Sequence, residues 1–131
     1  MTVRYQKWIT RKDLQENPDT LYAFGDNFHG RGFGGQAKEM RGEPNSLGIP
    51  TKIAPSMNDD AFFDDDKDMA YVKEGYDKIR KYCRQHFQNG GDLVIPSDGI
   101  GTGLAQLETR SPKIFAELQK LMSDIVEMGT K

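Results

Sequence analysis

The amino-acid sequence predicts an α/β domain in which helices flank a mixed central sheet. Short runs rich in apolar residues alternate with segments of helical periodicity along the 131 residues. Two of these runs, residues 21–24 and 92–96, lead directly into glycine-rich loops. No internal repeat or low-complexity linker interrupts the pattern, and the length suits one hydrophobic core. We therefore expect residues 1–131 to form a single domain with three layers, α/β/α.

The expected strands are runs of apolar, β-branched or aromatic residues. They are residues 3–9, 21–24, 47–52 and 92–96. The run at 21–24 is continuously apolar, which is typical of a strand covered on both faces. Pro50 in the third run cannot donate to a strand ladder, so that run is expected at an edge or at a break in the sheet.

The expected helices are recognised by caps and by apolar spacing. They cover residues 11–16, residues 36–41, about 20 residues from Met69, and a closing helix that runs nearly to the C-terminus. Thr10 and Asp13 resemble a capping box at the first of these helices. In the third, apolar residues that include Cys83 recur at spacings of three and four, and Cys83 is expected in the core. Ser111 is the expected N-cap of the closing helix, with Pro112 in its first turn.

The charge balance and the cysteine count exclude several classes of function. There are 18 Lys and Arg residues against 20 Asp and Glu, a net charge of −2, so no overall positive field attracts a nucleic-acid backbone. Nucleic acid is expected only as a modified substrate.

No stretch approaches the roughly 18 apolar residues of a membrane span, and the N-terminus lacks the apolar region of a secretory signal, so a cytoplasmic protein is expected. A lone cysteine can form neither an intramolecular disulfide nor a thiolate metal cluster. We expect no cofactor and no metal.

An acidic run between the third strand and the third helix is expected to be a solvated, mobile surface loop. It contains Asp59, Asp60, Asp64, Asp65, Asp66 and Asp68. The spacing lacks the pattern of an EF-hand calcium loop. Phe62 and Phe63 lie inside this run, and two adjacent aromatic rings need a core or a ligand to cover them.

The two glycine loops are the main indication of a binding site. In an open α/β sheet, ligands bind beyond the carboxyl ends of the strands, so loops that follow two strands can form one cleft. Glycines let backbone N–H groups approach a ligand closely, which suits a phosphate or diphosphate. Alternatively, the glycines serve only tight turns. Neither loop carries the Walker A or the Rossmann fingerprint, which disfavours both of those nucleotide sites.

At these loops the chain resembles the macro domain family, which binds ADP-ribose. The resemblance lies in GDNFHGRGFGGQAKEM after LYAF and in LVIPSDGIGTGLAQLETRSPKIFAEL near the end, about half of the chain. Gly101, Gly103, Leu104 and Leu107 match the loop of the branch that contains ADP-ribosyl-protein hydrolases and ADP-ribose 1''-phosphate phosphatases. The resemblance implies a macro-like three-layer fold. It also implies that ADP-ribose or a related nucleotide is the ligand, free or attached to an ADP-ribosylated macromolecule.

Three residues are candidates for catalysis. On the macro-like interpretation Asn27 orients a ribose, and Asp98 or His29 activates a water molecule. Each also has an ordinary structural explanation, because Asn and Asp beside glycine are common in turns and a loop histidine can lack any role. In one hydrolase branch a carboxylate follows the GxGL pattern, whereas this chain has Ala105 there.

The remaining candidates would hold the ligand. The resemblance implies that Asp26 would accept from the adenine amine. From the residue chemistry, Arg31 would clamp a phosphate, and Phe28 or Phe33 would stack on a base or ribose or else anchor the loop. The expected ligand-binding residues are Asp26, Arg31, Gly32, Phe33, Gly34, Gly35, Gly99, Ile100, Gly101, Thr102, Gly103 and Leu104.

These observations support a binding function with two main interpretations. The first is binding of ADP-ribose or a related nucleotide diphosphate followed by hydrolysis at the distal ribose. The second is a non-catalytic module that recognises or sequesters such a nucleotide, which the alanine after GxGL favours. A third interpretation is a protein-interaction domain that kept the scaffold and lost its ligand.

Overall fold

A four-stranded parallel sheet forms the centre of the part of the chain that the structure describes. The computed structural model describes residues 2–100 and 106–130, so the predicted site residues Gly101, Thr102, Gly103 and Leu104 lie outside the described residues. The strands are β1 (Val3–Gln6), β2 (Thr20–Asn27), β3 (Ser46–Lys52) and β4 (Asp92–Pro96), in the order β1-β4-β2-β3. We predicted a mixed sheet, but every described pair is parallel. A helical crossover lies between each strand and the next in sequence, and such a connection returns the chain in the same direction.

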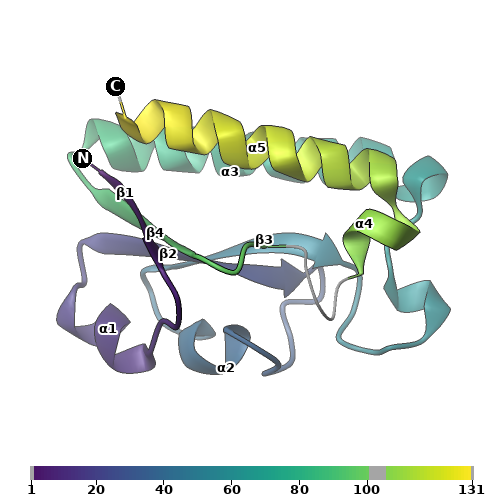
Figure 1. Ribbon diagram of the computed structural model, residues 1–131, viewed down its shortest axis with the longest axis horizontal. Helices are drawn as coiled ribbons and strands as arrows, with labels where there is room; N and C mark the ends of the chain where they lie inside the picture. The colour runs from purple at the N-terminus through teal and green to yellow at the C-terminus, as the bar shows by residue number, and fades with distance from the viewer. Residues whose placement is uncertain (1, 101–105, 131) are drawn as a thin grey trace.

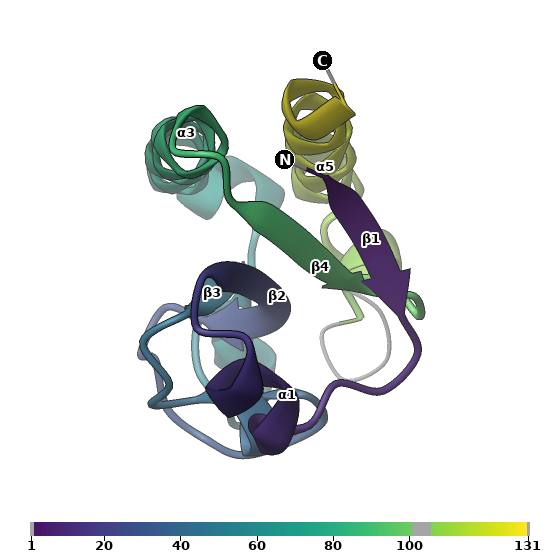
Figure 2. The ribbon, with the colours of Figure 1, turned by 90° about the vertical axis from the view of Figure 1, so that its left-hand side faces the viewer.

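Helices cover both faces of this sheet. They are α1 (Arg11–Glu16), α2 (Ala37–Met40), the 3₁₀ helix η1 (Asp59–Ala61), α3 (Asp65–Gln88), α4 (Leu107–Arg110) and α5 (Pro112–Thr130). The long helices α3 and α5 lie side by side over one face, and the short helices α1 and α2 lie on the other (Figures 1 and 2). This α/β arrangement is compatible with three layers. Among the described helices, none is both long and apolar enough to cross a membrane.

The strands at the centre of the sheet are buried on both faces. In β2, Leu21 and Ala23 belong to the core under α3 and α5, while Tyr22 and Phe24 belong to a second core against α1 and α2. Side chains of a strand alternate between its faces, so a continuously apolar strand supplies both cores. The prediction for residues 21–24 is therefore confirmed. Cys83 is buried in the larger core, as predicted, and burial raises the pKa of its thiol to about 12.

Local signals mark several element boundaries correctly. The capping box of α1 is present, with the Thr10 hydroxyl accepting from the Asp13 amide and the Asp13 carboxylate accepting from the Thr10 amide. Pro50 lies in the edge strand β3, as predicted. β1 ends at Gln6 rather than at residue 9, because the backbone of Ile9 is bonded to a side chain, that of Gln36, instead of to a strand.

The prediction that the acidic run is a solvated, mobile loop is wrong, because two of its carboxylates cap helices. Asp64 is the N-cap of α3 and accepts from the amides of Asp66 and Lys67. Acidic side chains in a first turn also interact favourably with the helix dipole. As a result, α3 begins at Asp65, before the predicted start at Met69. Phe62 and Phe63 are buried rather than exposed, which explains why this segment tolerates two adjacent aromatic residues.

Ser111 precedes α5 and Pro112 begins it, as predicted, but the side chain that caps this helix comes from the acidic run. The Asp65 carboxylate accepts from the amides of Lys113 and Ile114 at 3.1 and 3.0 Å. The Ser111 hydroxyl instead donates to the buried carbonyl of Phe63. Asp65 therefore links the first turns of the two long helices.

Candidate functional site

A cavity of about 520 Å³ lies where the parallel strands end. Residues at or just after the ends of β1, β2, β3 and β4 contribute to its wall, which is where parallel α/β sheets bind ligands. The structure brings part of both glycine loops into this one cavity. The predicted residues on its wall are Asp26, Asn27, Arg31, Gly32, Phe33, Gly34, Gly35, Asp98, Gly99 and Ile100.

Asp26 forms an ion pair at the floor of the first glycine loop. Its two carboxylate oxygens accept from the Arg41 guanidinium at 2.6 and 3.2 Å. Both side chains are about 15% exposed, at 14% for Asp26 and 16% for Arg41. Arg41 also donates to the carbonyls of Gly32 at 2.7 Å and Arg31 at 3.2 Å. The Asp26 carboxylate thus anchors the loop through Arg41, and its contact with an adenine amine stays a prediction.

Asn27 acts on the same loop from the next position of β2. Its side-chain amide donates to the Arg31 carbonyl at 2.7 Å, and its own backbone carbonyl accepts from the amide of Gly30 at 3.0 Å. The side chain is buried between the strand end and the loop. Asn27 therefore holds the loop in the structure, and its contact with a ribose stays a prediction.

The anchored loop leaves its own amides available. Within residues 2–100 and 106–130, none of the five consecutive amides from Gly32 to Gln36 donates a hydrogen bond. The carbonyls of Arg31 and Gly32 point at Arg41, and in a trans peptide the N–H points opposite to the C=O. The amides of Gly32 and Phe33 therefore point away from the guanidinium. Gly32 and Gly35 have φ of +96° and +57°, conformations that favour glycine.

The wall of the cavity is positively charged, unlike the chain as a whole. Four cations, Lys7, Arg31, Arg41 and Lys52, are set against two carboxylates, Asp26 and Asp98. A cavity with excess positive charge favours an anionic ligand even when the protein is slightly acidic.

Lys52 is held more rigidly than a surface lysine. Its ammonium donates to the Ser56 carbonyl at 2.8 Å and lies 4.4 Å from the centre of the Phe62 ring. The Arg110 guanidinium lies 3.8 Å from the centre of the same ring. Burial, together with the nearby charge of Arg110, lowers the pKa of Lys52 below its usual value.

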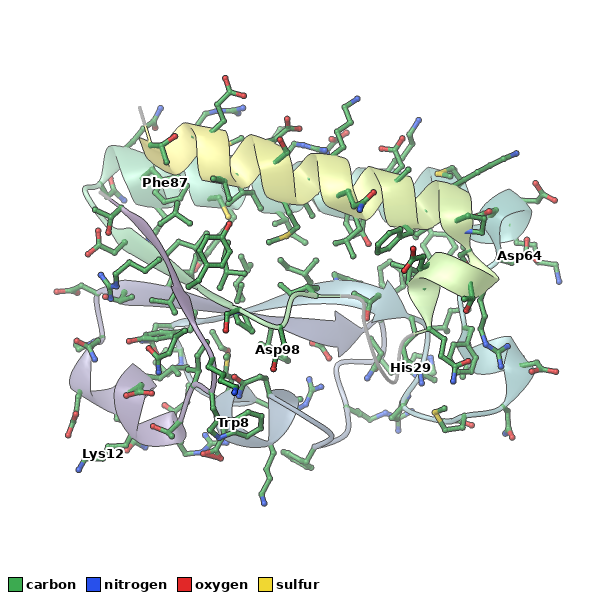
Figure 3. All side chains as sticks on the ribbon, in the orientation of Figure 1. Trp8, Lys12, His29, Asp64, Phe87 and Asp98 are labelled. Carbon is green, nitrogen blue, oxygen red and sulfur yellow. The ribbon has the colours of Figure 1, made fainter. Side chains whose placement is uncertain are left out.

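Of the three predicted catalytic residues, Asn27 and Asp98 lie on the cavity wall and His29 does not. Asp98 lies on the cavity wall in the turn that follows β4, where the Gly99 amide donates to the Pro96 carbonyl. His29 is not among the residues that line the cavity, and its ring nitrogen lies 3.2 Å from the Arg31 guanidinium. Figure 3 shows His29 well separated from Asp98 and from Trp8. Of the two alternatives for activating water, only Asp98 therefore lies on the cavity wall.

The two phenylalanines of the first loop have different environments. Phe28 packs against Tyr71 and Phe63, with ring centres 4.9 and 5.4 Å apart, so it anchors the loop to the core. Phe33 lies on the cavity wall and is 64% exposed. Of the two, only Phe33 remains a candidate for stacking on a ligand.

Comparison with protein families places the chain in one of them. A model of a family of unknown function, DUF7831, matches residues 4–121. The chain belongs to the DUF7831 family. The matched region includes almost all of β1, the whole of β2, β3 and β4, and the first half of α5, so the described cavity wall lies within what defines DUF7831. No curated protein and no solved structure matches the chain significantly.

Sequence reasoning missed several cavity residues of this DUF7831 member. Trp8 and Lys7 follow β1, while Lys52 ends β3 and Arg41 follows α2. Lys7, Trp8 and Lys52 could have been found, because parallel strands end at the same edge of the sheet and the residues at or after the end of every strand are candidates. Arg41 carried no such local signal. Among the described residues, no group of three His, Cys, Asp or Glu side chains could hold a metal ion.

Proposed function

We propose that this protein binds ADP-ribose or a related nucleotide diphosphate in the cavity at the strand ends. One observation carries the proposal, namely the five consecutive amides from Gly32 to Gln36 that donate no hydrogen bond within the described residues and line this cavity. Gly32 and Gln36 are half-buried, whereas Phe33, Gly34 and Gly35 are exposed, so water can bond to these N–H groups and a bound anion can displace it. The oxygens of a diphosphate suit such a row of donors.

Charge and size support the same class of ligand. The excess of cations on the wall complements a diphosphate, and about 520 Å³ is in the usual range for a small-molecule site. The α/β layers are compatible with a macro-like fold, although every described strand pair is parallel where a mixed sheet was expected, and the loop sequences resemble that family. A macro-like fold is therefore part of the proposal, as is a ligand that is free or attached to a macromolecule.

The geometry favours binding over catalysis. The Asn27 amide is bonded to the loop backbone, and His29 is absent from the cavity wall. Both observations support a non-catalytic module that recognises or sequesters the nucleotide.

Hydrolysis is the second candidate, and the position of Asp98 on the wall favours it. In that case the Asp98 carboxylate would take a proton from a water molecule as the water oxygen bonds to C1'' of the distal ribose or to the phosphorus of its 1''-phosphate. The bond from that atom to the leaving oxygen would break, and the leaving oxygen would take a proton from solvent. Asp98→Asn would then abolish product release while leaving ADP-ribose affinity within about threefold. If the wild-type protein releases neither phosphate from ADP-ribose 1''-phosphate nor ADP-ribose from modified protein, the binding module stands.

The test of binding compares Gly35→Glu with Gly90→Glu by calorimetry with ADP-ribose. Both glycines have positive φ, +57° and +84°, which strains any other residue, and no atom lies within 4 Å of an added Cβ at either, so neither substitution creates a clash at Cβ. Gly35 lies on the cavity wall, whereas Gly90 lies near the starts of the strands. We expect Gly35→Glu alone to lose binding, because a carboxylate would replace the phosphate at the amides. Absence of heat from folded wild-type protein at millimolar ADP-ribose would overturn the proposal.

A further inference from the structure

Two aromatic side chains on the cavity wall have no aromatic partner. Trp8 is 51% exposed and Phe33 is 64% exposed, and both line the cavity. Among the described residues, neither ring packs against another aromatic ring, whereas Phe28 packs against two. Large exposed apolar surfaces that face a cavity are costly in water and are typical of ligand contacts.

The backbone holds these two side chains in place. The Gln36 side chain accepts from the Ile9 amide at 2.8 Å and donates to the Ile9 carbonyl at 2.9 Å, which ties the segment after β1 to the first glycine loop. Ile9 is fully buried, so the neighbouring Trp8 is kept outside the core. Figure 3 shows Trp8 on the side of the sheet that carries α1 and α2. The cavity wall is therefore built with its aromatic surface exposed.

We propose that Trp8 and Phe33 form a nucleobase subsite that adjoins the row of loop amides. This inference rests on the proposed function. It adds that the nucleobase is the part of the ligand that determines specificity. Phe33 lies within the amide run, so a phosphate held there brings the rest of the nucleotide to these rings. A flat base stacks on an aromatic face, and such stacking is worth about 1–3 kcal/mol per base, or roughly a 5- to 150-fold change in affinity.

The chain offers a direct spectroscopic test, because Trp8 is its single tryptophan. Tryptophan fluorescence is followed during titration with ADP-ribose, ADP, ribose 5-phosphate and inorganic pyrophosphate. We expect quenching by the two adenine nucleotides and none by the two ligands that lack a base. Quenching of equal size by pyrophosphate at saturation would overturn the subsite, because the signal would then report the loop and not a stacked base.

Calorimetry on variants separates this inference from the proposed function. Trp8→Ala is expected to weaken ADP-ribose 5- to 150-fold and to leave pyrophosphate affinity within about twofold, and Trp8→Phe is expected to retain most of the affinity. Tyr5→Ala is the matched control, because Tyr5 is 60% exposed on neighbouring β1 and does not line the cavity. If ADP-ribose binds wild type and Trp8→Ala equally, the subsite is wrong and the proposed function stands. If no nucleotide binds wild type, the proposed function itself fails.

Discussion

Replacing Arg41 by methionine tests whether the ion pair with Asp26 shapes the first glycine loop. Methionine keeps much of the length and the packing over Phe24, whose ring centre lies 5.6 Å from the guanidinium carbon, but it removes the charge and every donor. The Asp26 carboxylate, with 14% of its side chain exposed, then loses its cation. The Gly32 carbonyl loses its 2.7 Å donor, whereas the Arg31 carbonyl keeps the bond from Asn27.

These losses set the expected size of the effect. Breaking a fully buried ion pair costs about 3–5 kcal/mol, and a fully exposed pair is worth about 0–1 kcal/mol. Side chains that are 14% and 16% exposed lie closer to the buried case. With the lost carbonyl bond included, we expect Arg41→Met to lower the free energy of unfolding by about 2–4 kcal/mol. Nucleotide affinity should fall with it, because the loop amides lose their fixed orientation.

Urea unfolding followed by far-UV circular dichroism measures the change, and a second variant tests its cause. In the wild-type protein the backbone N–H of Asn27 donates to the Asp26 carboxylate at 2.8 Å. Adding Asp26→Asn to Arg41→Met removes the unpaired charge and keeps a side-chain oxygen that can accept this bond. The double variant should therefore recover at least half of the lost stability. A loss of unfolding free energy below about 0.5 kcal/mol for Arg41→Met would refute the anchor. The anchor would also be refuted if the loss in the double variant equalled the sum of the losses in Arg41→Met and Asp26→Asn.

Three further predictions concern the helices and the edge strand. Asp65→Ala should cost about 1 kcal/mol more in chemical unfolding than Asp66→Ala, because both remove a first-turn charge but only Asp65 also caps α5; equal losses would contradict the cap. Backbone hydrogen bonds lower the pKa of Asp64, so its contribution is present above about pH 4 and is lost as the pH falls through the lowered pKa. Asp64→Ser keeps a capping oxygen that does not titrate, so thermal unfolding of this variant should depend less on pH below about 4; an unchanged acid profile would argue against the Asp64 cap. Tyr76→Phe should cost about 1 kcal/mol by removing the 2.7 Å bond to the Pro50 carbonyl, and a neutral result would show that water replaces the hydroxyl.

Local sequence signals predicted most of the elements. The capping box at Thr10, the apolar run at residues 21–24 and the buried stripe of the closing helix each depend on residues within a few positions of one another. Such signals report how a segment buries its own side chains, and for that they are sufficient. The element boundaries failed where a distant residue intervened. The first strand stops early because Gln36, 27 positions further on, takes the backbone bonds of Ile9.

Capping by distant carboxylates could not be predicted for the same reason. Asp65 lies 48 and 49 positions from the amides that it caps, and only the packing of α3 beside α5 brings them together. Serine before proline is a local signal, so the sequence predicted the N-cap position of Ser111 correctly but not the side chain that caps the helix. The acidic run was interpreted as solvent-exposed because nothing nearby in sequence could use its charges.

The candidate site was predictable in its place but not in its chemistry. Apolar strands that end in glycines indicate the edge at which a ligand binds. Trp8 escaped notice because the strand order, which sets β1 beside β4, is a property of the whole sheet. The roles of Asp26 and Asn27 depend on Arg41 and on the loop carbonyls, and a side chain that holds a loop carries the same sequence signal as one that holds a ligand.

This last distinction has a consequence for how affinity responds to mutation. Asn27 and Arg41 donate to carbonyls of the first loop, and Asp26 holds the Arg41 guanidinium, so we expect the loop amides and not these side chains to recognise an anion. Substitutions at the three positions should therefore lower stability and affinity together, in proportion to the loss of loop order. Substitution of Trp8, which is half exposed, should lower affinity alone. A plot of the two losses across variants would separate residues that shape the cavity from residues that contact its ligand. If Asn27→Ala lost affinity without losing stability, Asn27 would be a residue that contacts the ligand, and the result would support the predicted ribose contact.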